Sequence, residues 1–237
     1  MNWIQALVIK LIIEKIINRT KNVDFKFDSA VSGSVVISLI VNRAVLLIRG
    51  LLFLYSFKDT NFTYVGKSIR VFNRKNMSIG KHVTIGDYVY LSALGKGELK
   101  IDSGVNIGSY TQLVISTSFN DIGKFIHIHE NVAIGEFSYV GGAGGISIGK
   151  DTIIGQYFSA HPENHNYTNK DIIIRHQGVN RKGISIGENC WLGSKVTVLD
   201  GVTIGNNCVV TAGAVVTKSF PDGVMLGGVP AKMIKLI

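Results

Sequence analysis

Half of the histidines in this 237-residue chain lie in one short polar segment, residues 160–183, which reads AHPENHNYTNKDIIIRHQGVNRKG. They are His161, His165 and His176. Imidazole has a pKa near neutrality, so it can take the proton from a hydroxyl that attacks a carbonyl carbon. We therefore place the chemistry in this segment, with one of its histidines as a general base. His176, beside Arg175, is at least as well explained as a solvated loop residue.

A second histidine pair, His127 and His129, would share one face of a strand if residues 126–134 are extended. Such a pair can present metal ligands, but the sequence offers no persuasive third ligand. We therefore expect no metal. Cys190 and Cys208 form neither a disulfide framework nor a metal-binding spacing, which favours a reducing compartment and predicts a cytoplasmic protein.

Aliphatic residues recur at every sixth position through the last third of the chain. They are Ile186, Leu192, Val198, Ile204, Val210 and Val216. Several are followed by Gly, and the same Ile-Gly pairs recur upstream, from Ile79-Gly80 to Ile154-Gly155. A six-residue unit suits a short parallel strand plus a turn, with three units closing one triangular coil. Residues eighteen apart should then stack, as Cys190 and Cys208 would.

The repeat divides the chain into three parts. Residues 1–58 are an apolar, largely helical extension; residues 59–219 are the solenoid, with a loop excursion at about 160–183; and residues 220–237 are a capping segment. We expect a short helix near Pro230 in the capping segment. The six-residue period is also interrupted at residues 112–127, which predicts a loop or a distorted coil there.

The extension holds two apolar stretches. Residues 3–16 have helical apolar spacing, and residues 35–57 have the length of a membrane span but contain Arg43 and Arg49. The arginines disfavour a simple span. A cap on the solenoid, a contact with the membrane surface and a span remain as alternatives.

Charge narrows the choice of partners. The chain carries 25 Lys and Arg against 16 Asp and Glu, a formal net charge of +9, which favours an anionic partner. No motif that reads DNA or RNA is present, so we expect no nucleic acid. A phosphate-bearing cofactor and an anionic membrane surface remain.

The repeat units VTIGNN and ISIGEN resemble those of the hexapeptide-repeat acyltransferase family, over roughly residues 60–237. The similarity is greatest to bacterial polysaccharide O-acetyltransferases and to the galactoside and maltose acetyltransferases. It implies a mainly β fold, the left-handed parallel β-helix, and a homotrimer with active sites between neighbours. It also implies acetyl-CoA as co-substrate.

The resemblance extends to individual residues of the site. The segment from Asn164 to Tyr167 is similar to the loop of polysaccharide O-acetyltransferases, in which the position of His165 suits the base. Ala160-His161-Pro162 resembles the His-Pro site of the galactoside and maltose enzymes instead, which makes His161 the second candidate for the base, after His165. By the same match Trp191 walls the acetyl or acceptor pocket, with Asn164 and Tyr167.

The C-terminal coils are implied to bind the cofactor through backbone N–H groups and basic side chains. The positions that match the relatives are Gly193, Ser194, Ala212, Thr217, Lys218, Lys232 and Lys235. Lys218 is the best matched of the lysines.

These observations predict an acetyl-CoA-dependent O-acetyltransferase that acts on a sugar of a bacterial surface polysaccharide, located in the cytoplasm or peripherally on the inner face of the membrane. One alternative is an N-acetyltransferase for a nucleotide-linked amino sugar. An alternative of another class is a zinc hydratase like the γ-type carbonic anhydrases, which needs three histidine ligands.

Overall fold

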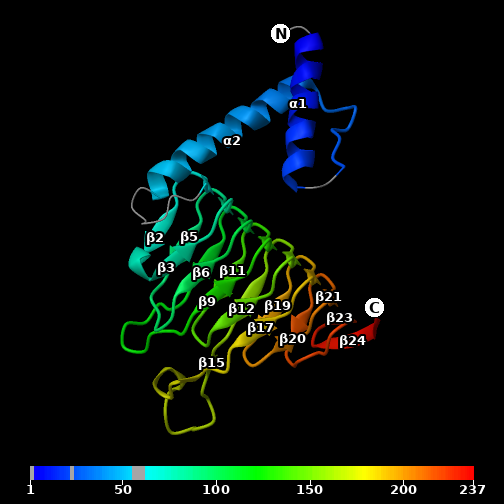
Figure 1. Cartoon of the computed structure of the whole chain (residues 1–237). Helices are drawn as coiled ribbons and strands as arrows, with labels where there is room; N and C mark the ends of the chain where they lie inside the picture. Colours follow the sequence, from blue (N-terminus) through cyan, green and yellow to red (C-terminus); the bar gives the residue numbers. More distant parts are fainter. Residues whose placement is uncertain (1–2, 22–23, 55–61) are drawn as a thin grey trace. The chain divides into compact units, whose positions relative to one another are not determined.

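The computed structural model describes residues 3–21, 24–54 and 62–237. The chain divides into two compact units at the junction of Ile48 and Arg49. The first is helical, and the second is a solenoid of short strands (Figure 1).

Three sheets run along the solenoid. Within the described residues, sheet A contains β1 (Tyr64–Val65), β4 (Thr84–Ile85), β7 (Asn106–Ile107), β10 (Ala133–Ile134), β13 (Ile153–Ile154), β18 (Trp191–Leu192), β21 (Val209–Val210), β23 (Val224–Gly228) and β24 (Ala231–Leu236). Sheet B contains β2 (Arg70–Phe72), β5 (Tyr90–Ser92), β8 (Gln112–Val114), β11 (Tyr139–Gly141), β14 (Ser159–His161), β19 (Thr197–Leu199) and β22 (Val215–Val216). Sheet C contains β3 (Met77–Ile79), β6 (Leu99–Ile101), β9 (Ile126–Ile128), β12 (Ile146–Ile148), β17 (Ile184–Ile186) and β20 (Thr203–Ile204).

Each coil contributes one strand to each sheet, and successive coils pair in parallel. In the last coils Ile186 pairs with Ile204 and Leu192 with Val210, the predicted offset of eighteen. The predicted left-handed parallel β-helix is confirmed. Upstream the offset is longer, as between Ile85 and Ile107, because extra residues enter at the turns.

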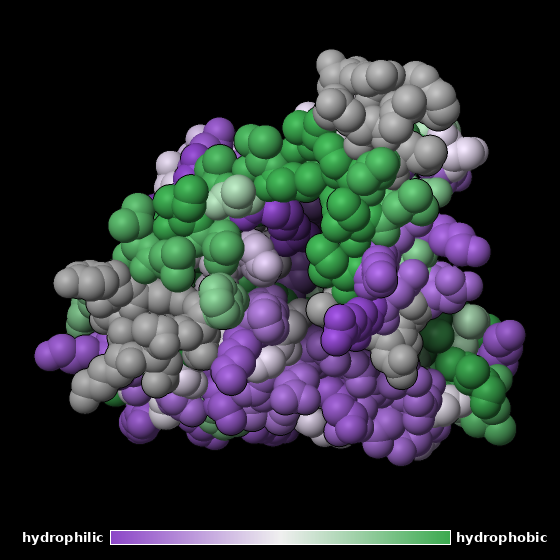
Figure 2. All heavy atoms as spheres, turned by 45° about the horizontal axis from the view of Figure 1, so that its top comes forward, coloured by the Kyte–Doolittle hydropathy of each residue, from purple (hydrophilic) through white to green (hydrophobic). Residues whose placement is uncertain are grey.

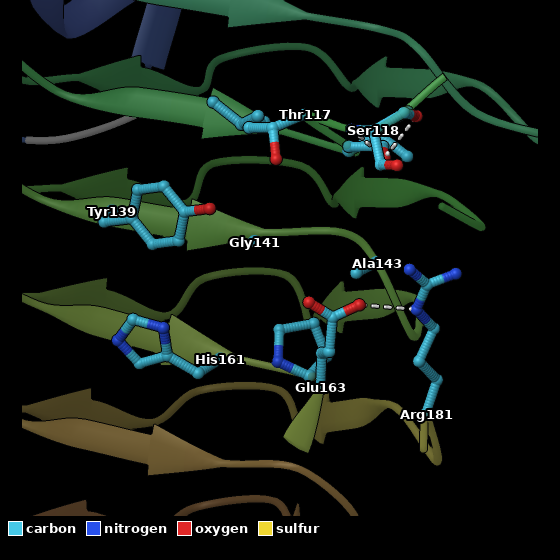
Figure 3. A pocket seen from close by; sticks show the side chains of 12 residues that line it. Thr117, Ser118, Tyr139, Gly141, Ala143, His161, Glu163 and Arg181 are labelled. Carbon is cyan, nitrogen blue, oxygen red and sulfur yellow. Dashed lines mark hydrogen bonds and ion pairs between the residues drawn. The ribbon is translucent and has the colours of Figure 1, made fainter. Parts of the chain in front are cut away.

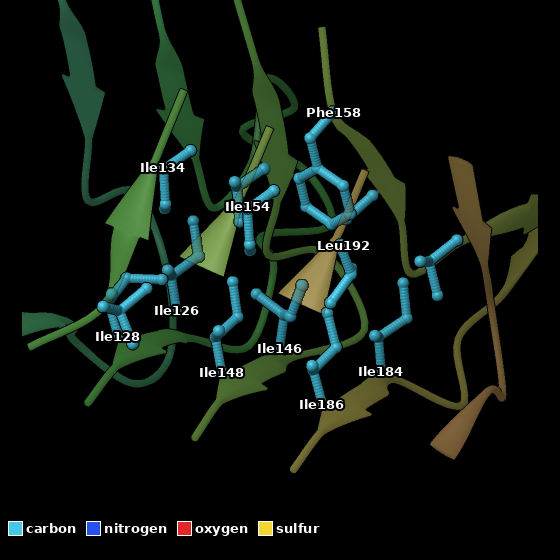
Figure 4. Close-up of a cluster of buried hydrophobic side chains, with 14 of the residues drawn as sticks. Ile126, Ile128, Ile134, Ile146, Ile148, Ile154, Phe158, Ile184, Ile186 and Leu192 are labelled. Atoms are coloured by element: carbon cyan, nitrogen blue, oxygen red, sulfur yellow. The ribbon is translucent and has the colours of Figure 1, made fainter. Parts of the chain in front are cut away.

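The inward-facing aliphatic side chains stack into a continuous core (Figure 4). Ile126, Ile146 and Ile184 form one column of sheet C and are nearly or fully buried. Cys190 and Cys208 are free thiols in the same core, with the Cys208 nitrogen 3.5 Å from the Cys190 sulfur. Their predicted stacking is therefore confirmed.

The recurring Gly marks the point where successive coils approach most closely. A Cβ on Gly149 would lie 2.5 Å from the carbonyl carbon of Gly187, and one on Gly187 would lie 2.6 Å from that of Gly205. Backbone atoms cannot yield as a flexible side chain does, so Gly149 and Gly187 cannot be replaced by a residue with a side chain without moving the coils apart.

The C-terminal segment corrects one prediction. Instead of the expected short helix, β23 adds in parallel to β21 and β24 returns antiparallel along β23. Lys232 and Lys235 therefore lie on a strand. The last coil exposes a row of unpaired backbone donors and acceptors, and an added strand satisfies them where a helix would not.

The N-terminal unit contains the predicted helices, α1 (Trp3–Lys21) and the first part of α2 (Gly33–Leu54). The side chains of Asn18 and Glu14 on α1 accept hydrogen bonds from the backbone N–H groups of Phe25 and Phe27, at 2.6 and 2.7 Å. Residues 55–58 of the predicted extension lie outside the described residues.

Helix α2 has features that bear on the alternatives that the sequence left open, a cap on the solenoid and a membrane contact or span. Its last turn belongs to the solenoid unit, where Phe53 packs on the core and lies 4.9 Å from the Arg74 guanidinium. Residues Gly33–Phe53 also form one helix long and apolar enough to cross a membrane, with only 11% of the most apolar window buried. Apolar side chains dominate the surface of this helical region (green in Figure 2).

Candidate active site

A cavity of about 120 Å³ opens on the outer face of sheet B, where both predicted interruptions of the repeat meet (Figure 3). One interruption follows β8, and the other is the excursion after β14. The lining residues are Val114, Ile115, Ser116, Thr117, Ser118, Tyr139, Gly141, Ala143, His161, Pro162, Glu163 and Arg181.

His161 is the last residue of β14 and projects into this cavity (Figure 3). Its ring stacks at 5.5 Å on that of Tyr139, one coil earlier, and its Nε2 lies 2.5 Å from the Ser159 hydroxyl oxygen. Partial burial lowers the pKa of His161 below its usual 6.5. The imidazole is therefore neutral at pH 7 and can accept a proton.

Tyr139 provides a hydrogen-bond donor beside this base. Burial, with a smaller contribution from the charge of Glu163, raises the pKa of the phenol above 10.0. The hydroxyl thus keeps its proton at neutral pH and can donate to an oxygen held in the cavity.

Arg181 joins the two interruptions. Its Nε donates to Glu163 Oε2 at 2.6 Å, its Nη1 lies 2.9 Å from Asp121 Oδ1, and its Nη2 donates to the Asp121 carbonyl oxygen at 3.3 Å. The Arg181 side chain is only 15% exposed. A planar guanidinium suits several acceptors in fixed directions, so this one side chain orders two walls of the cavity.

The excursion is an ordered structure rather than a featureless loop. Strands β15 (Asn164–His165) and β16 (Val179–Asn180) pair antiparallel, and a 3-10 turn, η2 (Ile174–His176), lies between them. Gln177 donates from its amide to the carbonyl oxygen of Asn169 at 2.8 Å. The Asp200 carboxylate accepts from the N–H of Gly183 at 2.8 Å and so fixes the return to the coil.

The cavity lining does not include His165, which the sequence favours as the base, or the predicted pocket residues Asn164, Tyr167 and Trp191. His165 and Asn164 are exposed on β15, and Tyr167 is 71% exposed. Trp191 lies on sheet A between Ile153 and Val209 of the adjoining coils and is 58% exposed. Of the two candidate bases the structure brings only His161 into the cavity, and the catalytic roles remain predictions.

The predicted cofactor residues fall into three places. Gly193, Ser194 and Ala212 stack at the corner between sheets A and B, where a Cβ on Gly193 would lie 2.6 Å from the Ala212 nitrogen. Thr217 and Lys218 follow β22 at the far edge of sheet B. Lys232 and Lys235 project from β24.

The model of the hexapeptide repeat of succinyl-transferase matches residues 183–218. The putative lipopolysaccharide biosynthesis O-acetyl transferase WbbJ of Escherichia coli is 29% identical over 145 residues, 58% of this chain and 74% of that protein. Over residues 183–218 the chain therefore carries the hexapeptide repeat, and it is similar to acetyltransferases that share this repeat.

Two further likenesses are of different extent. Over 54 residues, 23% of this chain and 27% of the relative, the chain is 50% identical to the galactoside O-acetyltransferase of Escherichia coli. The crystallographically analysed polysialic acid O-acetyltransferase OatWY matches 73% of this chain and 88% of its own, with a TM-score of 0.54 and 21% identity. This structural likeness supports the fold.

Sequence reasoning missed Tyr139, Glu163 and Arg181. The position of Tyr139 could have been found from the repeat. Ile134-Gly135 and Ile154-Gly155 start equivalent turns, so counting forward from each pair places Tyr139 opposite Ser159, as in the structure. Glu163 and Arg181 lie within the excursion, where the repeat gives no register. Arg181 and Asp121 are 60 residues apart in the sequence, so their contact could not be predicted from it.

We predict that Arg181→Met loosens both walls of the cavity. Loss of charge-assisted hydrogen bonds should cost about 1.5 to 3 kcal/mol in local stability. Hydrogen exchange should accelerate in residues 116–122 and 163–166 but not in β12. Arg175→Met, at an exposed position on η2, is the matched control. If hydrogen exchange is unchanged in Arg181→Met, the contacts of Arg181 with Glu163 and Asp121 are not needed to order the cavity walls.

Proposed function

We propose that this chain transfers the acetyl group of acetyl-CoA to a hydroxyl of a sugar in a bacterial envelope polysaccharide. The observation that carries the proposal is the neutral His161, beside a protonated Tyr139, in a cavity on the coil surface. The names of WbbJ and OatWY support a polysaccharide acceptor.

In the proposed reaction His161 takes the proton from the acceptor hydroxyl as its oxygen attacks the thioester carbonyl carbon. The tetrahedral intermediate then expels the sulfur, which receives that proton from the imidazolium. The products are an acetyl ester and the free thiol of CoA. Tyr139 donates a hydrogen bond that orients the sugar, and the Ser159 hydroxyl holds the imidazole ring in place.

The stacking of the coils suggests a path for the acetyl donor. His161 pairs with Leu199 on the next strand of sheet B, and Thr217 follows the residue paired with Val198 on the strand after that. Two strand spacings of ~4.8 Å place Thr217 about 10 Å from His161 along one edge of the sheet. An extended pantetheine arm fits along this edge, with the CoA phosphates near Lys218 and the acetyl group beside His161.

We also propose a homotrimer, with the active site shared between neighbours. Sheet A exposes Ile153 and Trp191 side by side, by 57% and 58%. The corner between sheets A and B carries a ladder of half-exposed stacked rings with centroids 4.9 to 5.2 Å apart: Tyr88, Tyr110, Phe137 and Tyr157. Burial of this surface between subunits would bring Trp191 to a neighbour's cavity.

We predict that His161→Ala lowers kcat by about 100- to 10,000-fold, the usual contribution of a general base. The assay follows acceptor-dependent thiol release from acetyl-CoA with envelope oligosaccharides, and with amino sugars in parallel. Alkali-labile product identifies an ester, and stable product identifies an amide and the N-acetyltransferase alternative.

His165→Ala is the matched variant, because it alters the same excursion at an exposed position. It should retain kcat close to that of the unmodified protein. If instead His165→Ala loses activity and His161→Ala keeps it, the base is His165. If no acceptor releases thiol, the proposed function is wrong.

The environment of His161 also predicts the pH profile. The base form is the neutral imidazole, which predominates above the pKa, and partial burial lowers that pKa. We expect kcat/KM to decline only as the pH falls below 6.5, and burial between subunits would move the decline further down. An acid limb centred above 6.5 would contradict this assignment.

We further propose that α2 attaches the enzyme to the inner face of the membrane, close to lipid-linked glycans. Val41, Val45, Ile48 and Leu52 form a stripe along one side of α2 and are 38% to 72% exposed. The two exposed arginines of the helix, Arg43 and Arg49, suit an anionic leaflet. A helix of this kind lies in the interface with its apolar side in the acyl chains.

We predict that the full-length protein floats with phosphatidylcholine–phosphatidylserine vesicles and that Val41→Glu with Ile48→Glu abolishes the flotation. Ile173→Glu with Ile174→Glu, at exposed apolar positions of the excursion, should leave it intact. Retention through a high-salt wash would indicate apolar insertion. Complete solubility at low salt would refute membrane attachment, and resistance to alkaline extraction would favour a span.

A further inference from the structure

A cluster of potential metal ligands lies on the outer face of sheet C. His127 occupies the middle of β9, His129 follows that strand, and Asp102 follows β6 on the preceding coil. Side chains alternate between the two faces of a strand. Ile126 and Ile128 are buried in the core, so the imidazoles of His127 and His129 point outward. His161 lies on sheet B, so this cluster takes no part in the proposed acetyl transfer.

The ligand atoms converge on one point. Asp102 Oδ2 lies 2.8 Å from His127 Nε2 and 3.6 Å from His129 Nδ1. One ligand atom from each residue lies within 4.8 Å of the other two. The imidazole rings are 3.7 Å apart at their centroids, and the side chains are only 22% to 37% exposed. A metal ion with bonds of about 2.0 to 2.2 Å to each atom needs only small rotations of these side chains.

The surroundings of the cluster also resemble those of a metal centre. The Ser147 hydroxyl, on the following coil, lies 3.1 Å from His129 Nε2 and so leaves Nδ1 facing Asp102. Hydrogen bonds to the other imidazole nitrogen commonly orient histidine ligands in this way. Lys100 Nζ lies 3.5 Å from Asp102 Oδ1, whereas both histidines contact the other carboxylate oxygen, Oδ2. The lysine contact therefore leaves Asp102 Oδ2 available as a ligand atom.

We propose that Asp102, His127 and His129 bind one divalent transition-metal ion per chain, with Zn²⁺ as the best match to two imidazoles and a carboxylate. Such a set leaves a fourth position for water. It differs from the three-histidine set of the zinc hydratase alternative. The ion would connect β6 to β9. The loop between β8 and β9 forms one wall of the His161 cavity, so the ion would stabilise the end of that loop.

The test uses the full chain without an affinity tag, since a polyhistidine tag would itself bind the ion. After chelation and dialysis, one equivalent of Zn²⁺ should bind, and Co²⁺ should give the visible absorption of a tetrahedral or five-coordinate site. Metal should raise the thermal midpoint, because it binds the folded chain. These readouts do not depend on acetyl transfer, so they stand or fall separately from the proposed function.

Variants locate the ion. Asp102→Asn and His129→Ala should each abolish stoichiometric binding and the thermal shift, whereas Ser147→Ala should weaken binding by about 10- to 100-fold. His176→Ala, an exposed histidine in the excursion, is the matched control and should bind as the unmodified chain does. Absence of stoichiometric binding, or equal binding by Asp102→Asn and the unmodified chain, would overturn the proposal.

Discussion

Each coil of this protein is held in register by backbone hydrogen bonds to the coils above and below and by the aliphatic side chains that stack beneath them. The rest of the structure depends on this register. Because successive strands lie ~4.8 Å apart, a residue's neighbours are decided by its position within the coil rather than by its distance in sequence. Tyr139 and His161 meet for this reason, and so do Asp102 and His127.

The sequence predicts the fold best where the coil length is constant. The period of six fixes the strands, the core positions and the stacking of the two cysteines in the last coils. Upstream, coils of unequal length hide the vertical partners, so Asp102 could not be matched to His127 by counting. The C-terminal hairpin was missed because Pro230 and two lysines read locally as a helix, whereas the open sheet edge decides the structure.

The site shows a similar division. The break in the repeat at residues 160–183 contains both histidines that the family resemblance proposed as the base, and residues of this segment form one wall of the cavity. Residue type alone could not separate His161 from His165, because the difference between them is position: one ends a strand of the coil, and the other lies on an exposed hairpin. Arg181 was out of reach, since its contacts join two irregular segments that share no periodicity.

The two ends of the solenoid are closed in different ways: the last turn of α2 packs at the first coil, and β24 covers the β23 edge of sheet A beyond the last complete coil. A bare coil end presents the same strand edges and core side chains that the next coil would accept. Molecules with both ends open would thus be able to stack end to end into filaments. The closures therefore set the length of the particle as well as stabilising it, and they keep a repetitive sequence from becoming a polymer.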